Sequence, residues 1–322
     1  MNHYERSALN FFAANPLDRL TLKRRDPAWL DTELQAPTTR FVPLWQLQNL
    51  FAHHDPAQVM LLELATTPEL LAFTEPILLG TYAGVTYFAV DVSSGDETAL
   101  SNLRALGNFQ DLRAAHPTLD GKTGAILAYA KAMAYWHQRH RFCGDCGSRT
   151  QSADGGFVRT CTNAACAKQH FPRTDSAIIT LVQAEDRCLL ARQATWPAGR
   201  YSVIAGFVEP GESLEAAVVR EVREETNITV TNVHYHSSQP WPFPGSLMLG
   251  YTAEASTFDL HCADQELEQA RWISRPEMVA EIKQGSLKLP PSVSISHRLI
   301  EFWFDAGDCG TLRDLLQPAT PW

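Results

Sequence analysis

Three glutamates recur at helical spacing in a short acidic segment, at Glu221, Glu224 and Glu225. The simplest interpretation of a glutamate-rich helix is a solvated face with ion pairs. The neighbouring apolar residues favour a different one, because they place Glu221 and Glu225 on or beside the packed side of the helix, with Glu224 next to it. Partly buried carboxylates that lie together repel one another and lose hydration, so they need cations. Mg²⁺ or Mn²⁺, which prefer oxygen ligands, would supply that charge.

The helix that must hold these glutamates is expected from Ser213 to Glu225. Ser213 is a good N-cap and follows a loop marked by glycine and proline at residues 206–211. Asn227 tolerates the left-handed conformation that closes a helix. The apolar stripe of this helix consists of Leu214, Ala217, Val218 and Val222. Arg220 is the cation expected beside the carboxylates.

Four of the seven cysteines form two close pairs, Cys143 with Cys146 and Cys161 with Cys166. Fourteen residues separate the pairs. Four thiolates so arranged can surround one tetrahedral Zn²⁺ and leave no open coordination position, so the ion should hold the fold and do no chemistry. The first pair alone would also suit a redox site. A zinc ribbon by itself would also suit a module that binds nucleic acid or protein.

An aromatic and proline-rich segment runs from Ser238 to Ser246 with the sequence SQPWPFPGS. Its prolines forbid a helix and stiffen an extended loop, which fixes the directions of Trp241 and Phe243. Such a loop can simply cover the core. Alternatively, its aromatic faces can stack on a flat nicotinamide or adenine ring.

The composition of the 322 residues limits the classes of protein that the chain can be. A hydrophobic content of 45% at this length predicts two or three domains. A formal net charge of −9 argues against non-specific electrostatic binding of nucleic acid over a large surface. With no signal-peptide pattern and no apolar run that could span a bilayer, we expect a soluble cytoplasmic protein without a membrane partner. The scattered Cys188, Cys262 and Cys309 are expected to be buried.

Three parts are expected along the chain. Residues 1–122 predict a mostly β domain with strands at 59–64 and 85–92, and residues 123–172 predict a linker helix, over 123–140, and the cysteine cluster. Residues 173–322 predict a mixed α/β (α+β) catalytic domain. Its first two strands, 177–182 and 188–191, should form a hairpin; the other elements expected are strands at 201–205, 228–235, 247–253 and 270–273 and a helix at 294–304.

The acidic segment resembles the Nudix box, the signature of a family of pyrophosphohydrolases. The matching positions are Gly206, Glu212, Arg220, Glu221, Val222, Glu224, Glu225 and Ile228. Asn227 stands where the family has glycine. The SQPWPFPGS array resembles the motif of the NADH pyrophosphatase subgroup, as do Asn15–Arg19, the four cysteines and His170–Arg173. The resemblance implies a Nudix α/β/α sandwich with a mixed sheet, after a zinc ribbon and a mostly β N-terminal domain.

Roles for particular residues also come from this resemblance. It implies that Glu221, Glu224, Glu225, Glu266 and the backbone carbonyl of Ala205 hold Mg²⁺ or Mn²⁺, and that Arg220 orients a carboxylate. Aromatic residues of the nicotinamide pocket would be Phe171, Phe207 and Trp241. Glu266 and the residues Gln239, Pro240, Trp241, Pro242, Phe243, Pro244, Gly245 and Ser246 would contact substrate, and Ser296 would help to hold a phosphate.

The implied reaction is hydrolysis of the pyrophosphate bond of NADH or NAD⁺ to nicotinamide mononucleotide and AMP, with Glu225 or Glu266 as general base. The NAD cap of an RNA is a further candidate substrate, and a homodimer is expected. Two alternatives stay open at this point: a Nudix hydrolase of ADP-ribose or another nucleoside diphosphate derivative, and a non-catalytic zinc-ribbon adaptor that senses nucleotides.

Overall fold

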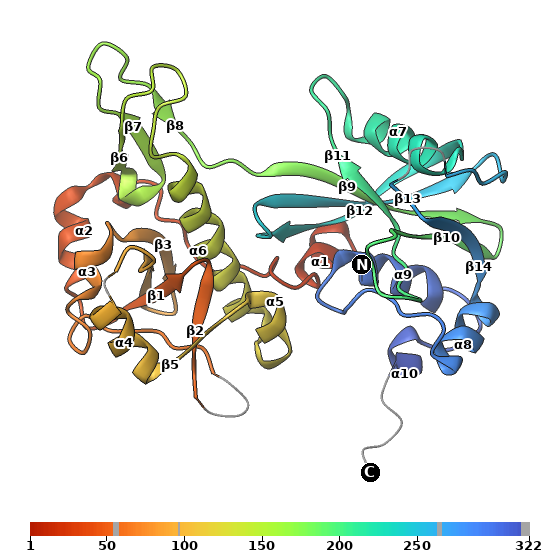
Figure 1. Cartoon of the computed structure of the whole chain (residues 1–322), viewed down its shortest axis with the longest axis horizontal. Helices are drawn as coiled ribbons and strands as arrows, with labels where there is room; N and C mark the ends of the chain where they lie inside the picture. The colour runs from red at the N-terminus through yellow and green to blue at the C-terminus, as the bar shows by residue number, and fades with distance from the viewer. Residues whose placement is uncertain (54–57, 96, 263–265, 317–322) are drawn as a thin grey trace. The chain divides into compact units, whose positions relative to one another are not determined.

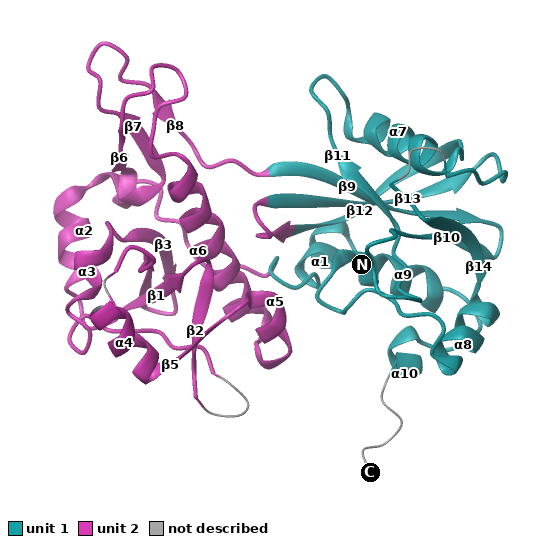
Figure 2. Cartoon of the chain, viewed as in Figure 1, with its two compact units in different colours: residues 1–13, 175–239, 246–322 teal, residues 14–174, 240–245 magenta. Residues whose placement is uncertain are grey.

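A computed structural model describes residues 1–53, 58–95, 97–262 and 266–316 (Figure 1). The contacts divide the chain into two compact units (Figure 2). Unit 1 comprises Met1–Ala13, Asp175–Gln239 and Ser246–Trp322, and unit 2 comprises Ala14–Thr174 and Pro240–Gly245. The division into three parts at 1–122, 123–172 and 173–322, which the sequence suggested, remains a prediction.

A mixed sheet forms the centre of unit 1. Its strands are β9 (Asp175–Ala184), β10 (Arg187–Arg192), β11 (Ile204–Phe207), β12 (Val230–Trp241), β13 (Ser246–Ala255) and β14 (Gln269–Ser274). The order is β12-β13-β9-β10-β14, and β11 also pairs with β9. β13 runs parallel to β9, whereas β10 and β11 run antiparallel to it. The β9–β10 pair confirms the expected hairpin.

Helices cover both faces of this sheet because the side chains of each strand alternate. Ile178 and Val182 of β9 pack with α7 (Leu214–Thr226), whereas Ile179 and Leu181 pack with α8 (Arg275–Gln284), α9 (Ile295–Asp305) and α10 (Leu312–Leu316) on the other face. The expected α/β/α sandwich is therefore confirmed. A short helix, α1 (His3–Ala8), also belongs to this unit.

Unit 2 contains a five-stranded sheet of order β3-β4-β1-β2-β5. Its strands are β1 (Thr39–Trp45), β2 (Gln48–Ala52), β3 (Ile77–Tyr82), β4 (Val85–Asp91) and β5 (Gly107–Gln110). The sheet agrees with the expected β character of this part, and β4 matches the strand expected at 85–92. The strand expected at 59–64 is wrong, because Val59 and Leu62 make only isolated bridges.

Helical segments accompany this sheet. They are η1 (Lys23–Arg25), α2 (Pro27–Leu34), α3 (Leu70–Phe73), α4 (Glu97–Leu106), α5 (Leu112–Ala115), η2 (His116–Thr118) and α6 (Gly121–Arg139). α6 confirms the helix expected at 123–140. It starts at the Asp120 cap and buries Ile126, Met133 and Trp136. Because α6 packs against β1, β3 and β4, it is part of this unit's core.

A small three-stranded sheet carries the cysteines. It consists of β6 (Thr150–Ala153), β7 (Val158–Cys161) and β8 (Gln169–His170), with the turn η3 (Asp154–Gly156) between β6 and β7. Of the isolated cysteines, Cys188 is buried as expected and Cys262 is partly buried. The expectation for Cys309 is wrong, because it lies exposed in the turn between α9 and α10. Within the described residues, no helix combines the length and apolarity that crossing a membrane requires.

Candidate active site and zinc centre

Helix α7 is anchored at both ends as its sequence predicts. The Ser213 side chain accepts a hydrogen bond from the Ala216 N–H, and Asn227 closes the helix with φ 63°. Between them, Ala217, Val218 and Val222 are buried against the sheet. The apolar stripe therefore fixes the rotation of α7 about its axis and so decides where its glutamates point.

The three glutamates of α7 differ in burial. Glu225 is 5% exposed, and the Glu221 side chain is 12% exposed. Both therefore lie toward the protein, as expected. The Glu224 side chain is 57% exposed. The expectation that it also turns inward is wrong, because its carboxylate extends along the helix surface toward Arg220, one turn earlier.

Arg220 connects the carboxylates of this region. Its Nε and Nη2 donate to the two oxygens of Glu212 at 2.5 and 3.0 Å, and its Nη1 lies 2.9 Å from Glu221 Oε1 and 3.0 Å from Glu224 Oε2. Nη2 also donates to the Phe207 carbonyl at 2.9 Å. These bonds raise the pKa of Arg220, with Glu212 as the main cause. Arg220 is thus a fixed cation that orients carboxylates, which is the role the sequence suggested.

Glu221 lies against strand β11 where that strand has glycine. A Cβ atom built on Gly206 would come within 2.0 Å of Glu221 Oε1. Burial raises the pKa of Glu221, Arg220 opposes this, and the charges of Glu224 and Glu266 raise it further. The site therefore holds more negative charge than its own arginine neutralises, which is the arrangement that favours a bound cation.

Glu266 and Glu268 both lie just before β14, which starts at Gln269. Glu266 is exposed, and its charge acts on Glu221. Glu268 forms an ion pair with Arg192 and donates its backbone N–H to the Arg192 carbonyl. Glu268 is thus paired with Arg192, whereas the charge of Glu266 acts on the acidic cluster.

Strand β11 presents two further candidates from the sequence. Ala205 pairs with Ile179 of β9 and is exposed, and Phe207 is 62% exposed although it is large and apolar. An aromatic side chain in water beside an acidic cluster is available to stack on a ligand.

The loop after β12 is built around two aromatic rings. Trp241 and Phe243 meet edge to face at 5.1 Å, and Phe243 lies 4.6 Å from the guanidinium of Arg113 and 5.1 Å from Lys131 Nζ. Lys131 is almost fully buried and also donates to the Leu47 carbonyl at 2.7 Å. These cations hold Phe243 through its ring face. Of the remaining loop residues, Pro242 is buried, Pro240 and Pro244 are exposed, and Gly245 lies near Tyr135, while Ser246 begins β13.

Gln239 and Ser296 are both buried in unit 1. The Gln239 amide donates to the Phe11 and Val293 carbonyls and accepts from the Ile295 N–H, all within 2.8 Å. Its side chain is therefore committed to the fold, and only its backbone remains for a substrate. Ser296 lies in the first turn of α9, with its hydroxyl 2.7 Å from that of Ser202. Phe171 belongs to unit 2, follows β8 and is exposed.

The four cysteines converge on one point in the small sheet of unit 2. Their Sγ atoms all lie within 4.8 Å of one another, with Cys143 and Cys166 at 3.8 Å and Cys146 and Cys161 at 3.4 Å. Tetrahedral Zn²⁺ with bonds of about 2.3 Å places sulfurs about 3.8 Å apart, so the cluster fits the ion. Burial raises the pKa of Cys161 to about 12, and a bound cation would be needed to keep it a thiolate.

Two contributors to this geometry had no role in the sequence-based assignment. Glu212 was recognised only as a position of the box, yet it supplies both oxygens that grip Arg220. Lys131, which holds Phe243, stands in an alanine-rich helix. The sequence signal that could have identified Lys131 is a lysine on the apolar face of this helix.

Three family models match the chain in series. A NADH pyrophosphatase-like rudimentary NUDIX domain matches residues 38–136, a NADH pyrophosphatase zinc ribbon domain matches 138–171, and a NUDIX domain matches 172–292. The NAD-capped RNA hydrolase NUDT12 of Macaca fascicularis is 32% identical over 91% of this chain and 73% of its own length. The NAD-capped RNA hydrolase NudC of Mycobacterium bovis is 40% identical over 60% and 64%. A crystal structure of a Nudix hydrolase from Nitrosomonas europaea has a TM-score of 0.42 and 20% identity, covering 53% of this chain and 96% of that one.

The NUDIX match covers the mixed sheet with its acidic helix, and the zinc ribbon match covers the four cysteines. The chain belongs to the Nudix hydrolases. Within them, the two domains that precede its NUDIX domain match models of the NADH pyrophosphatase type. The adaptor alternative is thereby set aside, since the domain and its relatives are hydrolases.

Proposed function

We propose that this protein hydrolyses the pyrophosphate bond of NADH or NAD⁺ and releases nicotinamide mononucleotide and AMP. The observation that carries the proposal is the acidic cluster, in which Arg220 fixes Glu221 while the charges of Glu224 and Glu266 act on it. The names of the relatives add support, because both are hydrolases of NAD-capped RNA. The same bond occurs in a free dinucleotide and in an NAD cap, so the cap of an RNA is included in the proposal.

Glu221, Glu224, Glu225, Glu266 and the Ala205 carbonyl are the groups proposed to hold Mg²⁺ or Mn²⁺. Oxygen ligands of this kind suit these ions, which would neutralise the pyrophosphate and lower the pKa of a water molecule. Arg220 would keep Glu221 in place through each turnover, because its bonds to Glu212 and Phe207 hold the guanidinium.

In the proposed reaction, a water oxygen attacks one phosphorus atom and the bridging P–O bond breaks. Glu225 or Glu266 accepts the proton of the water, and the leaving phosphate takes the electron pair of the broken bond. Each product then carries one phosphoryl group. No redox change occurs, so the nicotinamide ring serves only for recognition.

Recognition of the nicotinamide is assigned to three aromatic side chains, of which Phe171 and Phe207 are exposed and Trp241 is half-buried. Phe207 stands beside the acidic cluster in unit 1, and Phe171 and Trp241 belong to unit 2. We include residues 239–246 as substrate contacts, with Gln239 limited to its backbone, and Ser296 as a phosphate contact through its hydroxyl.

Several broader properties are part of the same proposal. The chain would comprise an N-terminal domain (1–122), a helix with a zinc ribbon (123–172) and the catalytic domain (173–322), with Zn²⁺ held by Cys143, Cys146, Cys161 and Cys166. It would act as a homodimer in the cytoplasm. Light scattering at working concentration tests the dimer, and a monomeric mass with full activity would count against it.

Mass spectrometry of the products is the direct test of the reaction. Purified protein is incubated with NADH, NAD⁺, ADP-ribose and an NAD-capped RNA, with Mg²⁺ or Mn²⁺. We expect nicotinamide mononucleotide and AMP from the dinucleotides, and RNA with a 5′ monophosphate from the capped RNA. Cleavage of ADP-ribose in preference to NADH would contradict the assigned substrate.

A further inference from the structure

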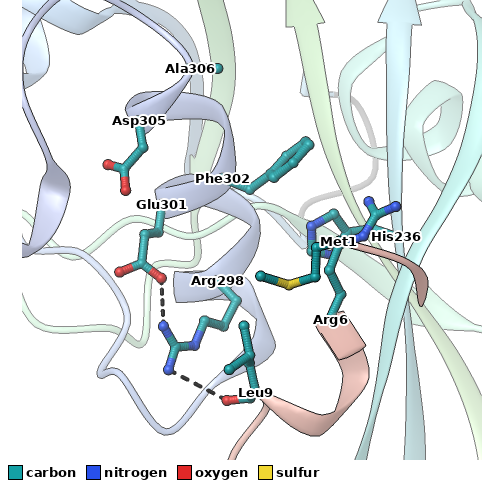
Figure 3. A pocket seen from close by; sticks show the side chains of 9 residues that line it. All are labelled: Met1, Arg6, Leu9, His236, Arg298, Glu301, Phe302, Asp305 and Ala306. Carbon is teal, nitrogen blue, oxygen red and sulfur yellow. Dashed lines mark hydrogen bonds and ion pairs between the residues drawn. The ribbon is translucent and has the colours of Figure 1, made fainter. Parts of the chain in front are cut away.

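Unit 1 contains a pocket that is separate from the acidic cluster. It has a volume of about 520 Å³ and lies between α1, β12 and α9 (Figure 3). This size falls in the range of small-molecule sites. Its walls come from those three elements, whereas the acidic cluster belongs to α7, β11 and the start of β14.

His236 of β12 lines this pocket and has one ring nitrogen without a hydrogen-bond partner. The side chain is 5% exposed, and its Nε2 has no partner among the described residues. Ser237 Oγ accepts from Asn10 Nδ2 at 3.1 Å and lies 2.8 Å from His236 Nδ1. In the tautomer in which Nδ1 accepts from the Ser237 hydroxyl, the neutral ring carries its proton on Nε2. A buried donor without a partner costs about 1–3 kcal/mol, which a ligand acceptor would recover.

The protonation state of His236 supports this assignment. Burial, followed by the charges of Arg6 and His3, lowers the pKa of His236 to about 4. The ring is thus neutral at physiological pH and carries a single N–H.

The two arginines of the pocket differ in their partners. Arg298 is neutralised by Glu301 at 2.6 Å and also donates to the Leu9 carbonyl, as the dashed lines in Figure 3 show. Arg6 has no carboxylate partner in the described part of the chain, and its guanidinium lies 5.7 Å from the centre of the Phe302 ring. Arg6 and His236 line the same pocket, and the charge of Arg6 contributes to the lowered pKa of His236.

Phe302 adds a flat apolar surface beside these polar groups. It is 49% exposed, and the His236 ring meets it edge to face at 4.7 Å. Further along α9, Asp305 also lines the pocket and offers a carboxylate. The pocket thus combines a cation, an N–H donor, a ring face and an acceptor in one volume.

We propose that this pocket binds a nucleoside monophosphate, with the phosphate at Arg6 and His236 Nε2 and the base on the face of Phe302. The hydroxyl or amino groups of the ligand face the carboxylate of Asp305. The phosphate supplies the acceptors and the negative charge that the first two residues lack. Stacking of a base on an aromatic ring supplies the remaining affinity. The site is independent of the proposed hydrolysis.

Calorimetric titration of the full chain tests the proposal with three probes and no added Mg²⁺ or Mn²⁺. AMP carries both phosphate and base, adenosine lacks the phosphate, and ribose 5-phosphate lacks the base. We expect saturable binding of AMP and weaker binding of the other two. Because AMP is also a product of the proposed reaction, variants must separate the pocket from the active site.

Arg6→Gln should weaken AMP binding by about tenfold to a hundredfold, since it removes a charged hydrogen-bond donor. Phe302→Leu should weaken it by removing the ring, and His236→Phe keeps a ring while removing the N–H. Arg313→Gln is the matched control, because Arg313 is an exposed arginine of α10 outside the pocket. Melting temperatures identify any variant that fails to fold.

NADH turnover measured without AMP should be unchanged in Arg6→Gln and Phe302→Leu. The proposal is overturned if the wild-type protein binds no AMP, or if AMP binds equally well to the wild type and all three pocket variants. Equal affinity for ribose 5-phosphate and AMP would also overturn it, because the base would then contribute nothing.

Discussion

The carboxylate of Glu221 occupies the space that a side chain at position 206 would need. A Cβ atom on Gly206 would lie 2.0 Å from Glu221 Oε1. The glycine of β11 is therefore required by an approach between strand and helix and not by an unusual backbone angle. It also explains how a carboxylate on α7 can lie this close to β11.

Gly206→Ala should consequently impair catalysis more than folding. The clashing atoms are at the end of a flexible side chain, so Glu221 can rotate away at little cost to stability, but it then leaves the acidic cluster. We expect kcat/KM for NADH to fall at least about tenfold with a small change in melting temperature. Gly121→Ala is the control, since a Cβ there meets only Ala14, at 4.0 Å. Equal activity of the two variants would refute the assigned role of Gly206.

Glu225→Gln should nearly abolish turnover while the protein stays folded. The substitution removes a negative charge from the proposed metal site and preserves the shape of a buried side chain. Steady-state kinetics with saturating Mg²⁺, together with circular dichroism, measure the two effects. Glu215→Gln makes the same change at an exposed position of α7 and should keep its activity. Full activity of Glu225→Gln at saturating Mg²⁺ would remove Glu225 from the site.

Cys146→Ser should cost the protein its zinc and part of its stability. A structural zinc ion contributes directly to the free energy of folding, and serine is a poor ligand for it. Elemental analysis should find about one zinc per chain in the wild type and much less in the variant, with a lower melting temperature. Cys309→Ser, at an exposed cysteine outside the cluster, should change neither quantity. Absence of zinc from the wild-type protein would sink this idea.

Unit 2 should lose stability in mild acid because of His137. Its Nε2 donates to the Gly156 carbonyl at 2.7 Å while Nδ1 accepts from Arg159, so the folded protein holds the neutral ring. Burial lowers the pKa of His137 to about 4. The unfolded chain therefore binds more protons between about pH 6.5 and 4, and the stabilisation, on the order of 3 kcal/mol, is complete above pH 6.5 and lost as pH falls.

Thermal denaturation between pH 7 and 4.5 checks this linkage. His137→Gln should be less stable than the wild type at pH 7, because it loses the ring contacts, but its melting temperature should depend less on pH. Parallel curves for the two proteins would show that another group causes the acid sensitivity.

Local chemistry predicted those elements whose ends and faces depend on nearby residues. Ser213 and Asn227 fix the ends of α7, and its apolar stripe fixes its rotation. The spacing of Cys143, Cys146, Cys161 and Cys166 alone predicted that their thiols converge. The exposed position of Glu224 was not predicted, because its carboxylate bonds to Arg220. The position of Arg220 depends in turn on Glu212, which lies in the loop before α7.

Contacts between distant parts of the chain were not predictable in this way. Asn10 donates to Ser237 Oγ and to the Ser238 carbonyl, and so joins residues more than two hundred positions apart. The side-chain amide of Gln239 forms hydrogen bonds with three backbone groups. The sequence of the loop suggests a ligand contact for that side chain, and only the packed structure reveals its use in the fold.

The last prediction separates a dinucleotide specificity from general pyrophosphatase activity. If Trp241 stacks on the nicotinamide ring, Trp241→Ala should remove roughly 1 to 3 kcal/mol of binding, as base stacking does on aromatic side chains. Efficiency toward NADH should then fall about tenfold to a hundredfold, at 1.4 kcal/mol per factor of ten. Part of any loss could come from Phe243, whose ring meets Trp241 at 5.1 Å but which is also held by Arg113 and Lys131. ADP-ribose resolves this, because it presents the same adenosine and pyrophosphate without the nicotinamide. A loss confined to NADH assigns Trp241 to the ring, whereas equal losses on both substrates would make the loop a scaffold and leave the preference for NADH without physical support.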